Sequence, residues 1–440
     1  MASLARIRPR PARPAAGRVL VRALLSIACL AFAGGLAGQD PAAPEPRFEI
    51  GAELRFRGET RSGNGVNPKS VDSFALSRLR LNLGLRPAKH VGVVVQAQDA
   101  RVAGLDPGGN PLRFHNLGFR QLYVAFGHES GPVTLRAGRQ ELDYFEGRLI
   151  GARGWSNTTP VWDGGKLILR RGEDSVDVFA VSHATVRDGP DLPKTGTAVA
   201  GAVGSIRSWV DGLRIEPFVL LTRQPVNPGS NVGGRLRTIG SRFSGVLDST
   251  WDYEFVLMGQ GGHVGGLDKR AWSATTGLGK TFERLPARPR LGFEWSHGSG
   301  DANPLDRTNS TFEPFFISRH RHYGEQDLVA LRNLQYLNGG VRVQPREGLE
   351  IEVEYISHRL ASRNDGLYAA SNALQVRAPE GGSSTGSVGS ELDAVLRYRP
   401  TERVQLVVGV FRFFAGPFVE RHVPGGESQT YLYTSLVVRL

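Results

Sequence analysis

Residues 74–86 read FALSRLRLNLGLR, and this stretch decides the fold. From Leu79 to Leu85 a leucine stands at every second position, and arginine, asparagine or glycine stands between. Successive side chains of a β-strand point to opposite faces, so one face here is apolar and the other basic. A strand of this kind suits a wall with lipid on one side and water on the other.

The same alternation recurs along the chain in segments of roughly nine to thirteen residues, the length that a tilted strand needs to cross a bilayer. Residues 48–61 put Ile50, Leu54 and Phe56 on one face and charged residues on the other. The further predicted strands are 91–100, 119–127, 133–141, 164–171, 175–183, 199–206, 213–223, 235–245, 251–260, 271–282, 290–299, 334–344, 349–359, 391–399, 404–413 and 430–440. Eighteen strands are predicted, and weak alternation at 199–206 and 235–245 leaves 16 as an alternative.

The links between these segments alternate in length. Short links such as 87–90 and 400–402 follow even-numbered strands, and long links, above all 300–331 and 360–390, follow odd-numbered strands. Bacterial barrels place short turns in the periplasm and long loops outside. The sequence therefore predicts an even number of strands, with both ends of the barrel in the periplasm.

A soluble β-sandwich or propeller also has alternating strands and turn-rich links. Charged residues on the inner face of many strands argue against it, because a dry core could not hold them. Aromatic residues such as Trp251 and Trp272 stand near strand ends, where a membrane interface would put them. The last segment alternates as far as Leu440. We therefore predict an all-β chain with a single transmembrane antiparallel β-barrel over residues 48–440.

The first 38 residues are typical of a cleaved secretory signal peptide, with six arginines before Ala23, an apolar run and a small-residue exit. Residues 39–47 would then be a short periplasmic segment. The only cysteine, Cys29, lies in the leader, which excludes disulfides and thiolate chemistry from the mature chain. No later stretch contains 18 consecutive apolar residues, so no membrane-spanning helix is predicted.

The charge balance favours an anionic partner. Without the six leader arginines, the net charge of +12 becomes +6, from 48 basic and 42 acidic residues. Only six of all the basic residues are lysine. Arginine binds carboxylates and phosphates through two parallel hydrogen bonds and stays charged wherever it is placed. No nucleic-acid-binding motif accompanies these residues, so a nucleic-acid partner is not expected.

Basic residues on the predicted inner face are the main functional candidates. The candidate lumen residues are Arg55, Arg57, Arg78, Arg80, Arg136, Arg342, Arg397, Glu352 and Glu354, with Arg214 and Arg290 also facing inward. Such residues can simply form neutralising pairs on a wet wall. However, the first two strands are rich in arginine, whereas Glu350, Glu352 and Glu354 share one later strand. We therefore expect one basic wall and one acidic wall, and a field that lowers the barrier for an anion.

Enzymatic and metal sites find little support. The one Gly-x-Ser-x-Gly match, residues 382–386, lies in a Gly/Ser-rich loop rather than on a strand-to-helix elbow. His320 and His322 stand among arginines without a helical His-x-x-x-His pair. Residues 299–306 depart from the ligand spacing of a calcium loop. No catalytic residue, metal or cofactor is predicted.

Several motifs in order resemble the alginate-export family of outer-membrane barrels. They are Glu53–Arg57, Arg78–Leu81, Gln96–Arg101, Gly138–Leu142, Gly147–Gly151, Trp155–Asn157, Trp162–Gly164 and, in the long loop, Thr311–Pro314 with His320 and Tyr323. The resemblance implies an 18-stranded barrel whose arginine-lined lumen passes a polyuronate outward, with Arg55, Arg57, Arg78, Arg80 and Arg139 as pore residues. The family usually has Leu-Phe-Pro where this chain has Phe315-Phe316-Ile317, and an aromatic residue where it has Leu440. These departures bear on the substrate.

The resulting prediction is an outer-membrane channel for an anionic solute, with export of an alginate-like polysaccharide as the leading function. A general anion-selective porin and a plugged structural or adhesive barrel remain as alternatives, and an outer-membrane hydrolase is a third. The expected partners are the anionic polysaccharide or a small anion, outer-membrane lipid and periplasmic export components.

Overall fold

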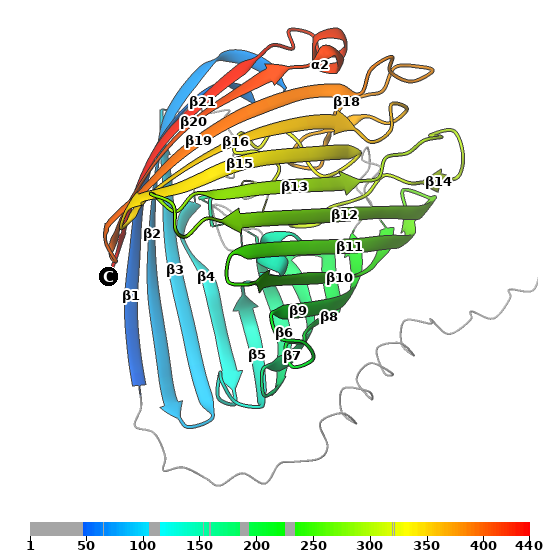
Figure 1. Cartoon of the computed structure of the whole chain (residues 1–440). Helices are drawn as coiled ribbons and strands as arrows, with labels where there is room; N and C mark the ends of the chain where they lie inside the picture. The colour runs from blue at the N-terminus through cyan, green and yellow to red at the C-terminus, as the bar shows by residue number, and fades with distance from the viewer. Residues whose placement is uncertain are drawn as a thin grey trace, which may run out of the picture. The chain divides into compact units, whose positions relative to one another are not determined.

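The computed structural model describes residues 47–440 except 65, 105–114, 153, 158–159, 185–192, 225–233, 319 and 321. The predicted signal peptide and residues 39–46 lie outside the described residues. The rest of the chain forms one closed antiparallel barrel of 18 long strands (Figure 1). No described helix has both the length and the apolar character needed to cross a membrane.

The strands of the wall follow one another around the barrel in chain order. They are β1 (Arg47–Asn64), β2 (Asn67–Ala88), β3 (Val91–Ala103), β4 (His115–Phe126), β5 (Val133–Gln140), β6 (Val161–Arg171), β7 (Asp174–Ala184), β8 (Pro193–Ser205), β9 (Leu213–Gln224), β10 (Gly234–Leu247), β11 (Trp251–Val264), β12 (Leu267–Thr281), β13 (Arg290–Gly298), β15 (Leu334–Arg346), β16 (Leu349–Leu360), β19 (Ser387–Thr401), β20 (Val404–Ala415) and β21 (Gln429–Arg439).

The last strand closes the barrel on the first. β21 pairs antiparallel with β1 from Glu53 opposite Arg439 to Arg61 opposite Tyr431. Closure removes the two free edges that an open sheet would present in the membrane. The two weakly alternating segments form full strands, β8 and β10, so the prediction of 18 strands is confirmed.

The two faces of the wall follow the alternation in the sequence. On β2 the leucines from Leu79 to Leu85 are exposed on the outer surface, with Leu81 50% exposed, whereas Arg78 is only 4% exposed inside the barrel. Aliphatic side chains on the outer face lower the free energy of the wall in lipid. The inner face takes the charged residues.

The links also match the prediction, with two exceptions. Turns such as residues 172–173, 347–348 and 402–403 are short, and the loops at residues 141–160, 299–333 and 361–386 are long. We call these two ends of the barrel the turn end and the loop end. The long links expected after the first and eleventh predicted strands do not occur: β1 and β2 pair as far as Asn64 opposite Asn67, and Gly265 and Gly266 turn β11 into β12 with φ of 59° and 83°.

Small elements occur at the loop end and inside the barrel. A 3-10 turn η2 (Phe145–Gly147) lies in the β5–β6 loop, and helix α2 (Pro417–His422) follows β20. The two-residue strand β14 (Thr308–Asn309) pairs parallel with β12, and β17 (Leu367–Tyr368) pairs with β18 (Leu374–Val376). None of these was predicted.

Two long loops fold into the barrel. The β5–β6 loop (residues 141–160) packs Phe145, Leu149 and Ile150 against inward apolar side chains of β7, β8, β9 and β11. The β13–β15 loop (residues 299–333) joins it, because Gly151 N donates to Phe316 O at 2.9 Å and Ser318 N to Gly147 O at 2.8 Å. The lumen is therefore narrowed by two loops that bind each other.

Candidate functional site: an arginine cluster in the lumen

The register of β1 and β2 brings four predicted arginines together on the inner wall. Arg55 stands opposite Arg78, and Arg80 stands opposite Glu53. Arg57 is the next inward residue on β1. A fifth arginine, Arg120, comes from β4, where a register shift beside Ala97 changes the alternation. We call this group the arginine cluster: Arg55, Arg57, Arg78, Arg80 and Arg120.

The arginine cluster holds the β5–β6 loop inside the barrel. Arg55 donates to Gly154 O at 2.9 Å and to Asn157 Oδ1 at 2.7 Å. Arg78 donates to the same Gly154 carbonyl at 2.7 Å, and Arg120 donates to Ala152 O at 2.8 Å. Several guanidinium groups therefore bind backbone carbonyls of one loop segment, which gives these arginines a structural role.

Arg57 begins a stack that links both loops to the wall. Its guanidinium carbon lies 3.6 Å from the centre of the Trp155 ring, and its Nη1 donates to Trp155 O at 2.7 Å. The His320 ring stacks on the same indole with ring centres 3.7 Å apart. Cation–π contacts of this kind strengthen when water is excluded. Trp155 thus joins β1 to the β13–β15 loop.

The arginine cluster contains more guanidinium groups than carboxylates in contact with them. Glu53 pairs with Arg78 at 2.6 Å, Glu59 pairs with Arg57 at 2.7 Å, and Glu141 pairs with Arg120. Among the described residues, the five arginines thus have three carboxylate partners, and Arg439 and Arg61 share two of these three. The region keeps a positive excess.

Among the described residues, Arg80 is the member of the arginine cluster that contacts neither a carboxylate nor a loop carbonyl. Its Nε donates to Gln98 Oε1 at 2.8 Å, but its Nη2 is buried and has no hydrogen-bond partner among the described residues. A buried guanidinium nitrogen without a partner loses hydration and gains nothing in return. Arg80 therefore keeps a donor without a described partner on the inner face of the wall.

The predicted acidic wall is largely neutralised, which corrects the expectation of two opposed walls. Glu352 binds Arg342 at 2.6 Å and Arg397 at 2.7 Å, and Glu350 binds Arg397 at 3.1 Å. Glu354 accepts a hydrogen bond from Asn338 at 2.7 Å. β16 is four strands from β1 around the wall, so these acids do not lie opposite the arginine cluster.

Two further predicted arginines, Arg136 and Arg139, lie apart from the arginine cluster. Arg136 faces the lumen nearer the turn end, paired with Glu129 at 2.8 Å. Arg139 is opposite Leu122, which is 45% exposed on the outer surface, so Arg139 belongs to the outer face. Its Nε and Nη2 bind the two oxygens of Asp163 at 2.8 and 3.0 Å. The structure does not place Arg139 in the lumen.

The comparison with known families agrees with this architecture. The family model described as alginate export matches residues 47–432. This chain belongs to the alginate-export family. The family match covers nearly the whole barrel, and it confirms the resemblance inferred from the sequence motifs. No curated protein sequence matches the chain.

Solved structures show the same fold in proteins of very different sequence. Pseudomonas aeruginosa OccK2 (OpdF), in complex with glucuronate, is 11% identical, with a TM-score of 0.58 over 89% of this chain and 98% of that one. Pseudomonas aeruginosa OpdO is 12% identical, with a TM-score of 0.57 over 89% and 97%. These structures show that the fold occurs in proteins of distant sequence. The alginate-export family match, together with the closed barrel, makes this protein an outer-membrane channel.

Sequence reasoning missed a second charged network in this alginate-export barrel. Arg148 of the β5–β6 loop donates to Glu254 at 2.9 Å and binds Glu294 at 2.6 Å, and Glu254 also binds Arg242 at 2.6 Å. Burial lowers the pKa of Arg148, but the two carboxylates outweigh it and raise the pKa above its ordinary value. No sequence periodicity indicates that a loop arginine reaches the opposite wall.

His320 has a charged environment that the sequence also did not reveal. Its Nε2 lies 2.6 Å from a Glu325 oxygen, and its Nδ1 lies 3.2 Å from an Asp327 oxygen. Burial lowers the pKa of His320, but these carboxylates outweigh burial and raise the pKa to about 9. At neutral pH the ring on Trp155 is therefore an imidazolium.

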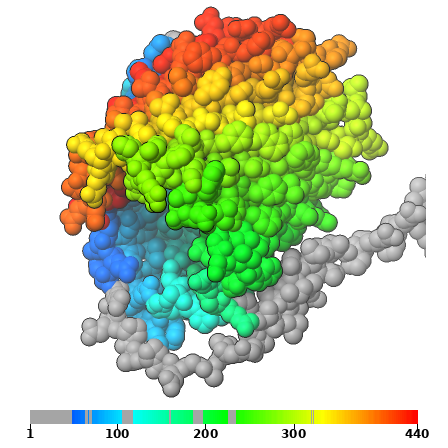
Figure 2. Space-filling view, viewed as in Figure 1, coloured from blue at the N-terminus to red at the C-terminus, as the bar shows by residue number. Residues whose placement is uncertain are grey.

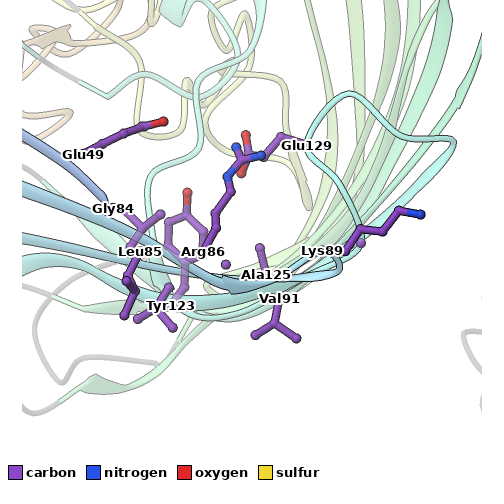
Figure 3. A pocket seen from close by; sticks show the side chains of 13 residues that line it. Glu49, Gly84, Leu85, Arg86, Lys89, Val91, Tyr123, Ala125 and Glu129 are labelled. Carbon is purple, nitrogen blue, oxygen red and sulfur yellow. The ribbon is translucent and has the colours of Figure 1, made fainter. Parts of the chain in front are cut away.

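A small pocket opens at the turn end, below the arginine cluster. Arg86, Tyr123 and Glu129 line it, and Figure 3 shows Arg86 and Glu129 pointing to one side of the sheet while Val91 points to the other. Its volume of about 160 Å³ is smaller than the roughly 300–1,000 Å³ of typical organic ligand sites. We regard it as part of the mouth of the lumen.

The serine and histidine motifs do not form a recognisable catalytic or metal site. Ser383 is buried, and its hydroxyl donates to Thr385 O at 2.8 Å, while His422 Nε2 lies 3.1 Å away. The serine proton is therefore directed at a backbone carbonyl. Within the described ranges, no three histidine, cysteine or acidic side chains are placed to hold a metal ion.

Proposed function

We propose that this outer-membrane channel passes an anionic polysaccharide of the polyuronate class outward through its lumen. The observation that carries the proposal is the positive excess of the arginine cluster, together with the unpartnered Nη2 of Arg80. A guanidinium group binds a carboxylate through two parallel hydrogen bonds, and every residue of a polyuronate bears a carboxylate.

The inner face of β2 supports this proposal with a series of donors along the lumen. Arg78, Arg80, Asn82 and Arg86 alternate with outward leucines from the arginine cluster towards the turn end. Inward neighbours on one strand are about 7 Å apart. Several moderate sites in series favour movement, because an ion must be able to leave each site as well as enter it.

The bound glucuronate in Pseudomonas aeruginosa OccK2 supports a uronate substrate for a barrel of this fold. At 11% identity it does not supply the residues involved. Those residues are proposed from this chain alone, with Arg80 as the central contact and Arg55, Arg57 and Arg78 as a basic wall that also anchors the β5–β6 loop.

Conductance across a planar bilayer tests the proposal. The wild-type barrel should conduct with anion preference, and Arg80→Gln should lower the anion-to-cation permeability ratio by roughly fivefold, since a unit charge about 4 Å from an ion contributes about 1 kcal/mol in aqueous surroundings. Arg412→Gln is the matched control, because Arg412 is exposed on the outer face. Cation preference in the wild type, or an unchanged ratio in Arg80→Gln, would refute the role of the arginine cluster.

A general porin for small anions is the second candidate, and the two inward loops favour it because they narrow the lumen. Oligouronates of increasing length distinguish the two functions. A polyuronate channel should show transient current blocks whose duration grows with chain length. A small-anion porin should pass glucuronate and show no block by long oligomers.

A further inference from the structure

Four exposed arginines lie together on the outer face of the wall at the loop end, on strands β9 to β12. Arg223 of β9 stands opposite Arg235 of β10. Arg237 of β10 stands opposite Gly261 of β11, which in turn stands opposite Arg270 of β12. We call these residues the outer arginine patch: Arg223, Arg235, Arg237 and Arg270. The outer wall of these strands is part of the green surface in Figure 2.

The outer arginine patch lies at the boundary of the apolar band. One row towards the turn end, Ile239 stands opposite Gly259, and Gly259 stands opposite Trp272. Ile239 is 60% exposed and Trp272 46% exposed. From Trp272 to Lys280, which pairs with Trp251, β12 advances eight residues, or about 26 Å. Because barrel strands are tilted by about 35–45°, this span is about 20 Å along the membrane normal, comparable to an apolar band of about 25 Å flanked by aromatic residues.

The outer arginine patch therefore lies just beyond the lipid tails, at the headgroups of the outer leaflet. Long loops mark the extracellular side of bacterial barrels, and the chain is an outer-membrane protein. Lipid headgroups of the outer leaflet are therefore the groups that lie next to the outer arginine patch.

Among the described residues, the outer arginine patch has no carboxylate as a counter-charge. The side chains of its four arginines form no hydrogen bond or ion pair with a described residue, and like charges placed directly opposite in a sheet destabilise it. Residues 225–233, which link β9 to β10, contain no Asp or Glu in their sequence. The nearby Asp268 is already paired with His263 at 2.7 Å.

Other arginines on the outer face are neutralised by carboxylates of the same face. Arg101 binds Asp99 at 2.6 Å, and Arg139 binds Asp163 at 2.8 Å, each within the same face of the wall. In the part of the chain that the structure describes, the outer arginine patch has no such carboxylates. A counter-anion from the membrane would remove the repulsion between its members.

No side chain projects from the wall between Arg237 and Arg270. Gly259 and Gly261 lie on β11 and put no side chain between β10 and β12. Arg237 and Arg270 therefore face each other across two strand spacings, about 10 Å. A Cβ placed on Gly259 would meet nothing within 4 Å. An acyl chain can lie along this apolar surface while its anionic headgroup reaches the guanidinium groups.

We propose that the outer arginine patch binds the phosphate groups of a phosphorylated glycolipid of the outer leaflet. Arginine forms paired, charge-assisted hydrogen bonds with phosphate. The acyl chains of the glycolipid would lie against Ile239, Leu257 and Trp272, which face the lipid directly below. The site is separate from the lumen and does not depend on what the channel transports.

Native mass spectrometry of the detergent-solubilised barrel tests this assignment with diphosphorylated lipid A as the probe. Wild type should retain lipid A, and the triple variant Arg235→Gln, Arg237→Gln, Arg270→Gln should bind it about tenfold more weakly or worse. The single variant Arg270→Gln should show a smaller loss. Because all three side chains are exposed, the variants should keep the heat-modifiable gel mobility of a folded barrel.

The matched control is the double variant Arg359→Gln, Arg412→Gln, which removes two isolated exposed arginines from the outer face near the loop end. It should retain lipid A as wild type does. Equal retention by the triple variant would overturn the proposal, as would equal binding of a phosphate-free lipid A. Displacement of lipid A by millimolar inorganic phosphate would overturn the assignment to a lipid.

Discussion

Arg55 shows why arginine rather than lysine stands at this part of the wall. One guanidinium group reaches both Gly154 O and Asn157 Oδ1 with separate nitrogens. An ammonium group is a compact point charge without the planar fork that reaches two acceptors at fixed positions. The residues that give the lumen its charge therefore also fix the geometry of the β5–β6 loop, and the two roles cannot be separated by a simple charge-conserving change.

His320 predicts a pH-dependent loop. Its pKa of about 9 is above the ordinary value, because Glu325 and Asp327 favour the charged ring. The ion pairs of the charged His320 ring stabilise the packed β13–β15 loop fully below about pH 6.5, and this stabilisation is lost as the pH rises through 9. We therefore expect conductance fluctuations from movement of the β13–β15 loop to become more frequent between pH 8 and 10 in single-channel recordings.

The double variant Glu325→Gln, Asp327→Asn is the control for this transition. Without the two carboxylates burial dominates, so the transition should move to a lower pH. Arg57 and Tyr433 also face the stack, and both remain in the control variant. A transition that stays at the same pH in this variant would show that another group causes it.

At the scale of elements, the strands could be predicted and the inward loops could not. Each predicted strand exists, because lipid on one face and water on the other impose a period of two on the sequence, as in β2. The contacts of Phe145 with Phe218 and of Arg148 with Glu294 depend on how a loop returns into the barrel. Such contacts leave no periodic pattern.

The predicted site shows the same division. Alternation correctly placed Arg55, Arg57, Arg78 and Arg80 on the inner face of β1 and β2. It could not show Arg120, since a bulge in β4 changes the face on which that residue lies. Arg139 came from motif resemblance, and its register opposite Leu122 puts it on the outer face.

Because Phe145 packs the β5–β6 loop against the wall, we expect that removing its ring lets the loop open while the wall stays folded. Its ring is buried and lies edge-on to Phe218, with ring centres 5.2 Å apart. Phe145→Ala should destabilise the packed loop by about 3–5 kcal/mol. Amide hydrogen exchange at residues 142–157 should accelerate, while the thermal unfolding of the barrel should change little because the strand ladder is intact.

Phe255→Ala is the comparison for this experiment. Phe255 lies on β11, and its side chain is exposed on the outer face, away from the loop. It should leave exchange in the loop unchanged. If Phe145→Ala lowered the unfolding temperature of the whole barrel as much as it accelerated loop exchange, the loop and the wall would form one cooperative unit.

For the whole molecule, closure between β1 and β21 is the feature that can be tested most directly. Gly58 stands opposite Thr434, and a Cβ on Gly58 would lie 3.6 Å from Thr434 Oγ1. The double variant Gly58→Cys, Thr434→Cys should therefore form a disulfide in the folded barrel. Because it joins the first and last strands, the bond should stabilise the barrel by about 6 kcal/mol in a chain-entropy account.

The crosslink is read from gel mobility before and after reduction. The matched pair is Gly58→Cys, Leu436→Cys, because Leu436 stands opposite Phe56 and is a diagonal neighbour of Gly58 at roughly 7–8 Å. That distance is too long for a disulfide without movement of the backbone. Crosslinking in the diagonal pair and not in the direct pair would mean that the register of closure differs.

The stack on Trp155 makes this residue an intrinsic fluorescence probe of the constriction. In the described part of the chain, this indole has a guanidinium group at 3.6 Å and an imidazolium ring at 3.7 Å, and it joins both inward loops to the wall. A version that keeps Trp155 and replaces the other five tryptophans with phenylalanine would emit from this one place. The brightness and colour of its fluorescence would then follow the constriction in solution, without an attached dye.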